Sequence, residues 1–106
     1  MKIINLSEQN SVFNHFIAEM RDQVIQKDAM RFRRNLERIG EVMAYEISKT
    51  LDYQTQEVTT PLGIAQANLA SNSIVIASIL RAGLPLHEGL LHYFDRAQNA
   101  FIAAYR

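Results

Sequence analysis

The chain has 106 residues, of which 48% are apolar, and this fits one small globular domain with a single hydrophobic core. Lysine plus arginine and aspartate plus glutamate number 11 each, so the net charge gives no reason to expect nucleic acid or an anionic membrane as a partner. The sequence has no cysteine, no leader pattern and no apolar run of about 20 residues, which excludes disulfides and thiolate catalysis and predicts a cytoplasmic protein without a membrane span.

Two amphipathic helices are predicted in the first half of the chain, after an extended start. Asn10 or Ser11 can cap the first, whose apolar residues recur every three or four positions. Asp28 can cap the second and longer helix, in which an apolar stripe runs down to about Leu51. The apolar positions are Val12, Phe13, Phe16, Ile17 and Met20 in the first helix and Phe32, Leu36, Ile39, Met43 and Ile47 in the second.

The stretch QTQEVTTPLGIAQANL predicts a β-hairpin. Polar residues alternate with β-branched or apolar residues on both sides of Pro61-Leu62-Gly63. A proline followed closely by a glycine is typical of a chain reversal. We therefore expect an arm of two antiparallel strands.

The last part of the chain predicts a βαβ unit. An apolar strand covers Ile74 to Leu80, a short helix runs from about Pro85 to Phe94, and a second apolar strand covers Ala100 to Tyr105. Strands joined in this way are parallel with a right-handed crossover, and strands this apolar imply a sheet covered on both faces. The chain is therefore predicted to contain half of an open α/β sheet.

Both predicted strands end in an arginine. Arg81 follows the first strand and Arg106 the second, and ligands of open α/β sheets bind beyond the carboxyl ends of the strands. Two guanidinium groups and the amino end of the helix near Pro85 would favour a phosphate or carboxylate there, and Gly83 permits close approach of the backbone. Alternatively, an arginine at the end of a strand forms only ion pairs at the surface, and the pattern alone leaves that alternative open.

Four motifs in this order resemble the uracil phosphoribosyltransferase family. They are GEVMAYEISKTL in the second helix, TTPLG in the hairpin, ILRAG after the apolar strand and the closing AAYR. The resemblance implies a type I, Rossmann-like phosphoribosyltransferase fold and the conversion of uracil and 5-phosphoribosyl 1-diphosphate to uridine monophosphate and pyrophosphate. It also implies Mg²⁺ bound with the diphosphate substrate.

The resemblance assigns residues to the phosphoribosyl diphosphate site. Arg81 and Arg106 match the family's two substrate-holding arginines, and Leu80, Arg81, Ala82 and Gly83 match its pyrophosphate loop. Loops of this kind in the family's relatives sometimes contain a non-trans peptide, which we expect between Leu80 and Ala82. The following LPLHEG departs from the glycine and methionine more usual after this arginine.

Family members are about twice as long as this chain, which lacks their glycine-rich ribose phosphate loop, the adjacent carboxylates and the segment that reads uracil. We therefore expect an amino-terminal portion, in which no catalytic residue is assigned. The predicted division is one partial phosphoribosyltransferase domain over residues 1–106, with a helical segment at 1–52, a hairpin arm at 53–70 and the βαβ unit at 71–106.

Other polar motifs favour structural roles. His87 and His92 are five positions apart and His15 lies in another element, so metal binding is not expected and all three are interpreted as surface or packing residues. RFRRNLER is interpreted as a solvated helix face with an ion pair between Arg33 and Glu37 rather than as a nucleic-acid site.

Two hypotheses for the function remain. In the first, the chain is part of a phosphoribosyltransferase in which Arg81 and Arg106 hold the substrate. In the second, it is a non-catalytic α/β module that only self-associates. In both, apolar stripes in the helices Val12 to Met20 and Asp28 to Leu51, together with the hairpin around Pro61, predict a homodimer or higher homo-oligomer.

Overall fold

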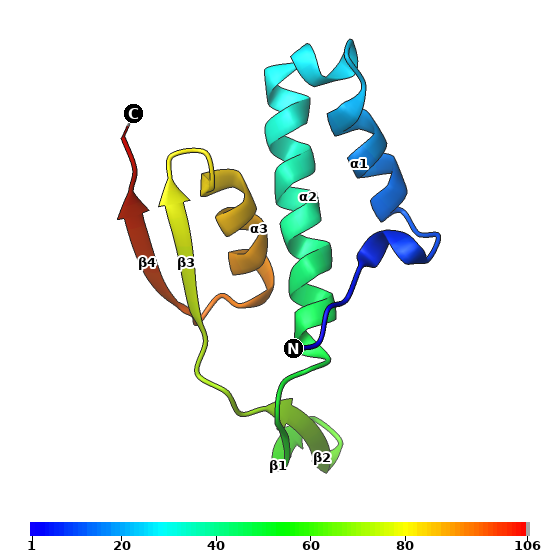
Figure 1. Ribbon diagram of the computed structural model, residues 1–106. Helices are drawn as coiled ribbons and strands as arrows, with labels where there is room; N and C mark the ends of the chain where they lie inside the picture. Colours follow the sequence, from blue (N-terminus) through cyan, green and yellow to red (C-terminus); the bar gives the residue numbers. More distant parts are fainter. Residues whose placement is uncertain (106) are drawn as a thin grey trace.

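The computed structural model describes residues 1–105 and combines helices with two separate pairs of strands (Figure 1). None of the helices in this range has both the length and the apolar character needed to cross a membrane. In chain order the elements are η1 (Leu6–Glu8), α1 (Phe13–Arg21), η2 (Ile25–Lys27), α2 (Ala29–Ser48), β1 (Tyr53–Thr60), β2 (Gly63–Ala70), β3 (Val75–Leu80), α3 (Leu84–Tyr93) and β4 (Gln98–Ala103).

Both predicted amino-terminal helices are confirmed. The Ser11 hydroxyl accepts a hydrogen bond from the Phe13 N–H at 3.2 Å, at the start of α1. At the start of α2, the Asp28 carboxylate accepts from the Arg31 N–H at 3.0 Å, as its N-cap role requires. Helix α2 ends at Ser48, three residues before the predicted end, because the next N–H groups bond to carbonyls three positions back in a tighter turn.

Two glycines allow a close approach of α2 and α3. A Cβ added at Gly40 would come within 2.5 Å of the Leu86 carbonyl oxygen, and one added at Gly89 would collide with the Glu37 carbonyl oxygen. Because the opposing atoms belong to the backbone, they cannot move aside as a flexible side chain can. The two helices lie side by side (Figure 1), and their backbones leave no room for a Cβ at these two positions.

Polar contacts join α1 to α2. The Asn35 side chain is 1% exposed; its Nδ2 donates to Glu19 Oε2 at 2.7 Å, and its Oδ1 accepts from Arg38 Nη1 at 3.1 Å. Arg31 Nη1 lies 3.2 Å from the same Glu19 oxygen. The hydrogen bonds from Asn35 and then Arg31 favour the carboxylate and hold the pKa of Glu19 below its ordinary value.

The prediction that Glu37 forms an ion pair with Arg33 is wrong, because its partner is Arg34. Arg34 Nη1 lies 2.6 Å from Glu37 Oε2 and 3.8 Å from Glu41 Oε1. On a helix the positions three and four residues apart are both neighbours, so the sequence does not decide between them. The Arg34 side chain is 44% exposed, in agreement with the predicted solvated face.

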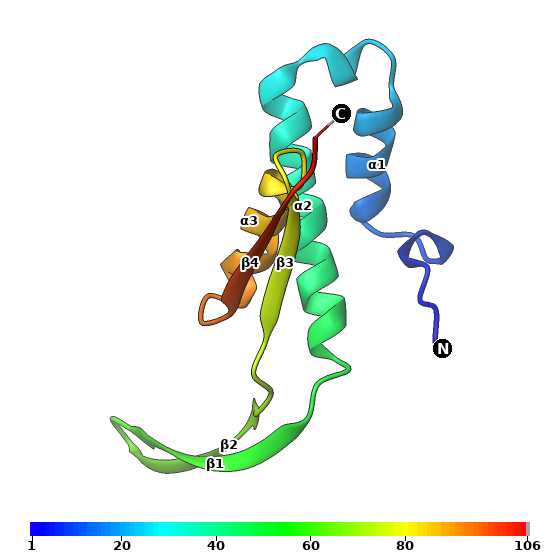
Figure 2. The ribbon, with the colours of Figure 1, turned by 60° about the vertical axis from the view of Figure 1, so that its left-hand side comes forward.

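The hairpin is confirmed and extends away from the helices (Figure 2). Strands β1 and β2 pair antiparallel over their whole length, from Tyr53 with Ala70 to Thr60 with Gly63. Gly63 has a φ of +134°, which only glycine adopts without strain, and the Thr60 hydroxyl donates to its carbonyl oxygen at 2.7 Å. This turn reverses the chain at the predicted position.

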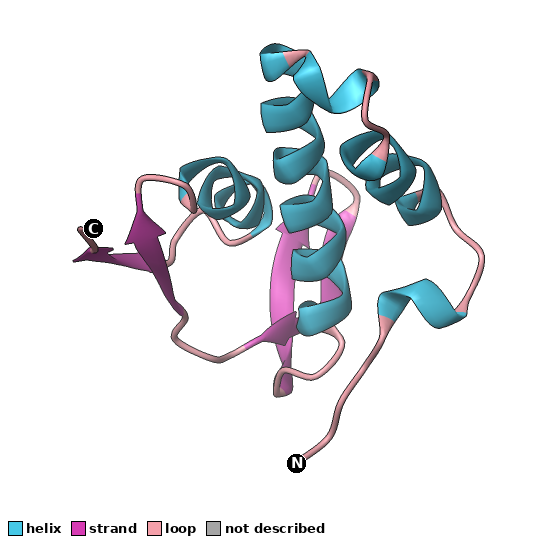
Figure 3. Cartoon of the chain, turned by 45° about the horizontal axis from the view of Figure 1, so that its top comes forward, coloured by secondary structure: helices cyan, strands magenta, loops and turns pink. Residues whose placement is uncertain are grey.

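The βαβ unit is also confirmed, as a second sheet separate from the hairpin (Figure 3). Strands β3 and β4 are parallel, with α3 between them in the chain. Strand β4 begins two residues before the predicted Ala100, because Gln98 and Asn99 pair with Val75 and Ile76. Among residues 1–105 the expected cover on both faces is not found, since Val75 and Ile79 are each 60% exposed while Ile76 and Ser78 on the other face are buried.

Replacing Gly89 by alanine should separate α2 from α3. We expect Gly89→Ala to lower the free energy of unfolding by about 1 to 3 kcal/mol through overpacking, although alanine is intrinsically the better helix former. Urea unfolding followed by circular dichroism measures this change. Glu88→Ala, on the exposed neighbouring residue, is the matched control and should stay within about 0.5 kcal/mol. Equal stability of the Gly89 variant and the unsubstituted chain would contradict the close contact.

Candidate functional site

The predicted anion loop follows directly from the carboxyl end of β3. Arg81 comes after Leu80, the last residue of the strand, and the Leu80–Arg81 peptide bond is cis, which confirms the expected non-trans peptide. The Gly83 N–H donates to the Ile79 carbonyl oxygen at 3.1 Å, and the Leu84 N–H donates to the Arg81 carbonyl oxygen at 3.1 Å. These two bonds fold the loop into a tight turn against the strand.

Glycine is required at position 83 for space. A Cβ there would collide with the Ser78 hydroxyl and approach the Ile79 carbonyl oxygen within 2.9 Å. The φ of Gly83 is −75°, so close packing on the strand, and not an unusual backbone conformation, selects glycine. Close approach at Gly83 was predicted, but the part played by Ser78 was not, and its only signal is a polar residue inside the apolar run IVIASIL.

The amino end of α3 lies beside the loop, as predicted, but offers few free donors. Pro85 has no N–H, the Leu84 N–H is used within the turn, and the His87 N–H donates to the Gly83 carbonyl oxygen at 3.0 Å. Of the first-turn residues of α3, Leu86 is therefore the one whose N–H has no acceptor within the described part of the chain. An anion at this end would therefore depend on the Arg81 guanidinium more than on the helix N–H groups.

Arg106 lies outside the described residues. Strand β4 runs parallel to β3 as predicted, with Leu80 in register with Ala103, but it ends at Ala103, two residues before the predicted end at Tyr105. Neighbouring strands are about 4.8 Å apart, so chain segments that leave these two ends start close together. Convergence of Arg106 with Arg81 stays a prediction.

The three histidines are divided between surface and packing, as expected. His15 is exposed, and His92 Nδ1 lies 2.7 Å from Glu41 Oε1 on the neighbouring helix. His87 is 4% exposed and pairs with Asn99 on β4, a partner that was not predicted from the sequence. Within residues 1–105, no group of three or more histidine, aspartate or glutamate side chains is placed to hold a metal ion.

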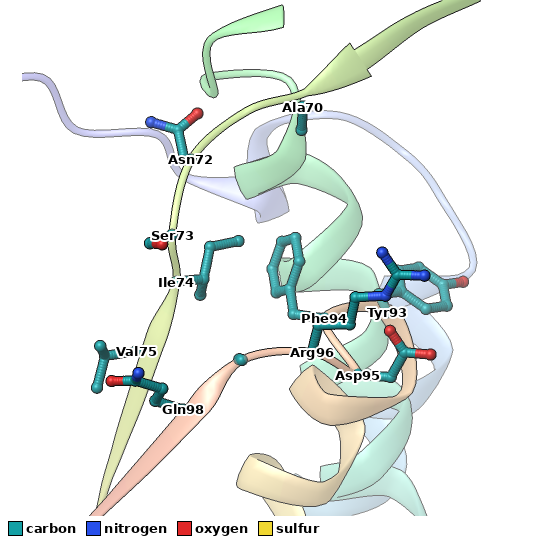
Figure 4. Close-up of a pocket in the computed structure, with 11 residues that line it drawn as sticks. Ala70, Asn72, Ser73, Ile74, Val75, Tyr93, Phe94, Asp95, Arg96 and Gln98 are labelled. Carbon is teal, nitrogen blue, oxygen red and sulfur yellow. The ribbon is translucent and has the colours of Figure 1, made fainter. Parts of the chain in front are cut away.

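A cavity of about 380 Å³ lies at the other end of the sheet from Arg81 (Figure 4). Its lining includes Asn72, Phe94 and Arg96, near the amino ends of β3 and β4. A second hollow of about 360 Å³ lies beside the anion loop and is lined by Ala82, Gly83 and residues of β3 and α3. The hollow beside the loop therefore lies at the predicted ligand-binding edge of the sheet, whereas the cavity in Figure 4 lies at the opposite edge.

A parallel βαβ unit with a short turn between strand and helix defines an α/β protein. The comparisons with known proteins specify it further. A sequence model of the uracil phosphoribosyltransferase family matches residues 7–106, and the chain belongs to this family.

Individual relatives agree with this assignment. The chain is 56% identical to uracil phosphoribosyltransferase of Porphyromonas gingivalis over all of its 106 residues and 49% of that protein, and 37% identical to that of Metallosphaera sedula over 90% of this chain and 45% of that protein. A solved Aquifex aeolicus protein superimposes with a TM-score of 0.78 at 30% identity, covering 94% of this chain and 47% of the other. The chain thus spans about half the length of the curated relatives it matches.

Replacing Arg81 by alanine should weaken anion binding at this edge. We expect the unsubstituted chain to bind magnesium pyrophosphate with about millimolar affinity, and Arg81→Ala to raise Kd at least tenfold, because one charge-assisted contact contributes about 1.5 to 3 kcal/mol. Chemical-shift changes at the amides of residues 80–84 during a pyrophosphate titration give Kd. Arg96→Ala, at the opposite end of the sheet, is the control and should leave Kd unchanged. The same Kd for both variants would place the anion elsewhere.

Proposed function

We propose that this chain is the amino-terminal portion of an enzyme that converts uracil and 5-phosphoribosyl 1-diphosphate to uridine monophosphate and pyrophosphate. The observation that carries the proposal is the family match over residues 7–106, which includes the turn that places Arg81 at the carboxyl end of β3. Similar proteins that bear the name uracil phosphoribosyltransferase support the same reaction. This reaction belongs to pyrimidine salvage, and a cytoplasmic location stays a prediction from the sequence.

The proposed role of this portion is to hold the diphosphate. Leu80, Ala82 and Gly83 form the turn, and Arg81, together with Arg106 farther along the chain, would bind phosphate oxygens by forked hydrogen bonds. In the transition state the bond from the ribose carbon to pyrophosphate breaks, so negative charge grows on the leaving group. Positive charge fixed beside that group stabilises the transition state more than the ground state and lowers the barrier.

Magnesium enters this proposal with the substrate and not as a resident ion. Among residues 1–105 no carboxylate or histidine cluster fits a metal site. Mg²⁺ in phosphate-transferring sites is commonly held by substrate phosphates together with few protein ligands. The proposed ligand is therefore the magnesium complex of the diphosphate, and the chain's own contribution is the arginine loop.

A chimera tests the proposed reaction. We expect this chain, followed by the unmatched half of the Porphyromonas gingivalis relative, to form uridine monophosphate from uracil, phosphoribosyl diphosphate and Mg²⁺, and the 106-residue chain alone to form none. Turnover requires the far end of the ribose and the base to be held as well, and no residue here is assigned to either task. Arg81→Ala should lower kcat/KM of the chimera about 100-fold. Product from the short chain, lost with the same substitution, would contradict the proposed division of the site.

The second candidate function is self-association without catalysis. The surface of the chain supports self-association, which is compatible with both hypotheses. The accessible surface is 8579 Å², whereas a compact chain of this mass exposes about 6,000 Å². One face of the hairpin carries exposed apolar side chains in register, since Val58 pairs with Ala65, and Leu69 lies farther along the same face. We propose that this face contacts a second copy of the chain.

Charge on that face should break the proposed dimer. We expect the unsubstituted chain to sediment as a dimer at micromolar concentration and Val58→Asp to shift it to monomer, because an unpaired carboxylate would be buried in the contact. Gln66→Asp, on the opposite face of the same hairpin, is the control and should remain dimeric. Sedimentation of the unsubstituted chain as a monomer would refute the proposed contact.

A further inference from the structure

His87 is the buried polar side chain of α3, and it faces the sheet. Its Nε2 lies 2.7 Å from Asn99 Oδ1 on β4, and its ring centroid lies 5.0 Å from that of Phe101. Since the amide oxygen can only accept, Nε2 carries the proton in this arrangement. Nδ1 is then a bare acceptor, and in the described part of the chain this buried atom has no hydrogen-bond partner.

Packing alone does not require an imidazole at this position. A methionine or leucine would bury similar apolar volume against Phe101 without leaving a polar atom unpaired, and an unpaired buried group costs free energy. What the imidazole adds is the hydrogen bond to Asn99. Within residues 1–105 this is the only side-chain hydrogen bond that joins α3 to a strand.

A directional contact matters for this helix because apolar burial alone does not fix its position on the sheet. Apolar burial depends on area and not on direction, so by itself it tolerates sliding of a helix along the sheet. A hydrogen bond of 2.7 Å between two defined atoms is lost when the helix slides, so it opposes that movement. The pair formed by His87 and Asn99 therefore fixes α3 along the direction of the strands.

The position of α3 is transmitted to the anion loop through the backbone. The His87 N–H donates to the Gly83 carbonyl oxygen at 3.0 Å, and the Gly83 N–H donates to the Ile79 carbonyl oxygen at 3.1 Å. Hydrogen bonds thus connect Asn99 on β4 with His87, His87 with Gly83, and Gly83 with the carbonyl oxygen of Ile79 near the end of β3. Arg81 takes no part in these bonds but lies in the chain between Ile79 and Gly83, and its own carbonyl oxygen accepts from the Leu84 N–H at 3.1 Å.

We propose that His87 is a positioning residue for the Arg81 loop. Its hydrogen bond to Asn99 holds the amino end of α3, and with it Gly83 and Arg81, at a fixed height above the carboxyl ends of the strands. The effect of His87 on diphosphate binding rests on the proposed function, in which this loop holds the diphosphate. The consequence for the order of the loop is independent of any ligand.

Three variants of the 106-residue chain separate the hydrogen bond from packing. His87→Met keeps apolar volume and removes the donor, His87→Gln keeps an amide N–H that can reach Asn99, and Asn99→Leu removes the acceptor at an exposed position that tolerates substitution. Amide hydrogen exchange without ligand reports the order of the loop at Gly83. The Phe32 amide, bonded to the Asp28 carbonyl oxygen in α2, reports the stability of the rest of the chain.

We expect exchange at Gly83 to rise about tenfold in His87→Met and Asn99→Leu relative to exchange at Phe32, and to stay within about threefold in His87→Gln. The Kd of magnesium pyrophosphate should rise about fivefold to tenfold in the first two variants and less than twofold in the third. Rescue by glutamine distinguishes positioning from packing, because glutamine restores the donor and not the ring contact with Phe101.

The other outcomes are equally informative. Unchanged exchange at Gly83 in both His87→Met and Asn99→Leu, or an equal rise at Gly83 and Phe32, would overturn the positioning role. If His87→Met does not fold, Asn99→Leu decides alone, since it removes the same bond from the strand side. Faster exchange confined to the loop, in a chain that binds no pyrophosphate, would support the positioning role and refute the proposed function of the loop.

Discussion

The crossing of α2 and α3 at Gly40 and Gly89 is the contact on which the arrangement of this protein depends. Helix α3 lies between α2 and the β3–β4 pair, so the long amino-terminal helix is joined to the sheet through α3 (Figure 1). The backbones meet closely, and the Glu37 and Leu86 carbonyls occupy the space where a Cβ would lie. Loss of this contact would remove the support of α3 and of the loop at its amino end.

The two sides of α3 act differently on that loop. Gly89 allows close backbone contact with α2, whereas His87 forms a directional bond with Asn99 on β4. Between them they determine where the helix begins relative to the strands, and the helix begins next to Arg81. In the proposed function, the guanidinium directly after an apolar strand would supply fixed positive charge beside the leaving group.

The sequence by itself determined the features that depend on neighbours along the chain. Helical periodicity, the Asp28 cap and the reversal before Gly63 follow from backbone geometry within a few residues, and the parallel βαβ connection follows from the order of strand, helix and strand. The structure contains all of them. The family motifs predicted the Arg81 loop and its non-trans peptide in the same way, because a motif is a local property. The close approach of backbone at Gly83 was likewise visible as a glycine after a strand.

Only the tertiary structure decided which distant residues meet. Gly89 and Glu37 are 52 residues apart, and His87 and Asn99 belong to different elements, so no local pattern records either contact. Even within α2, Glu37 pairs with Arg34 because two helical positions compete and side-chain geometry selects one. The physical reason is common to these cases: periodicity fixes the face on which a residue lies, whereas its partner depends on the packing of whole elements.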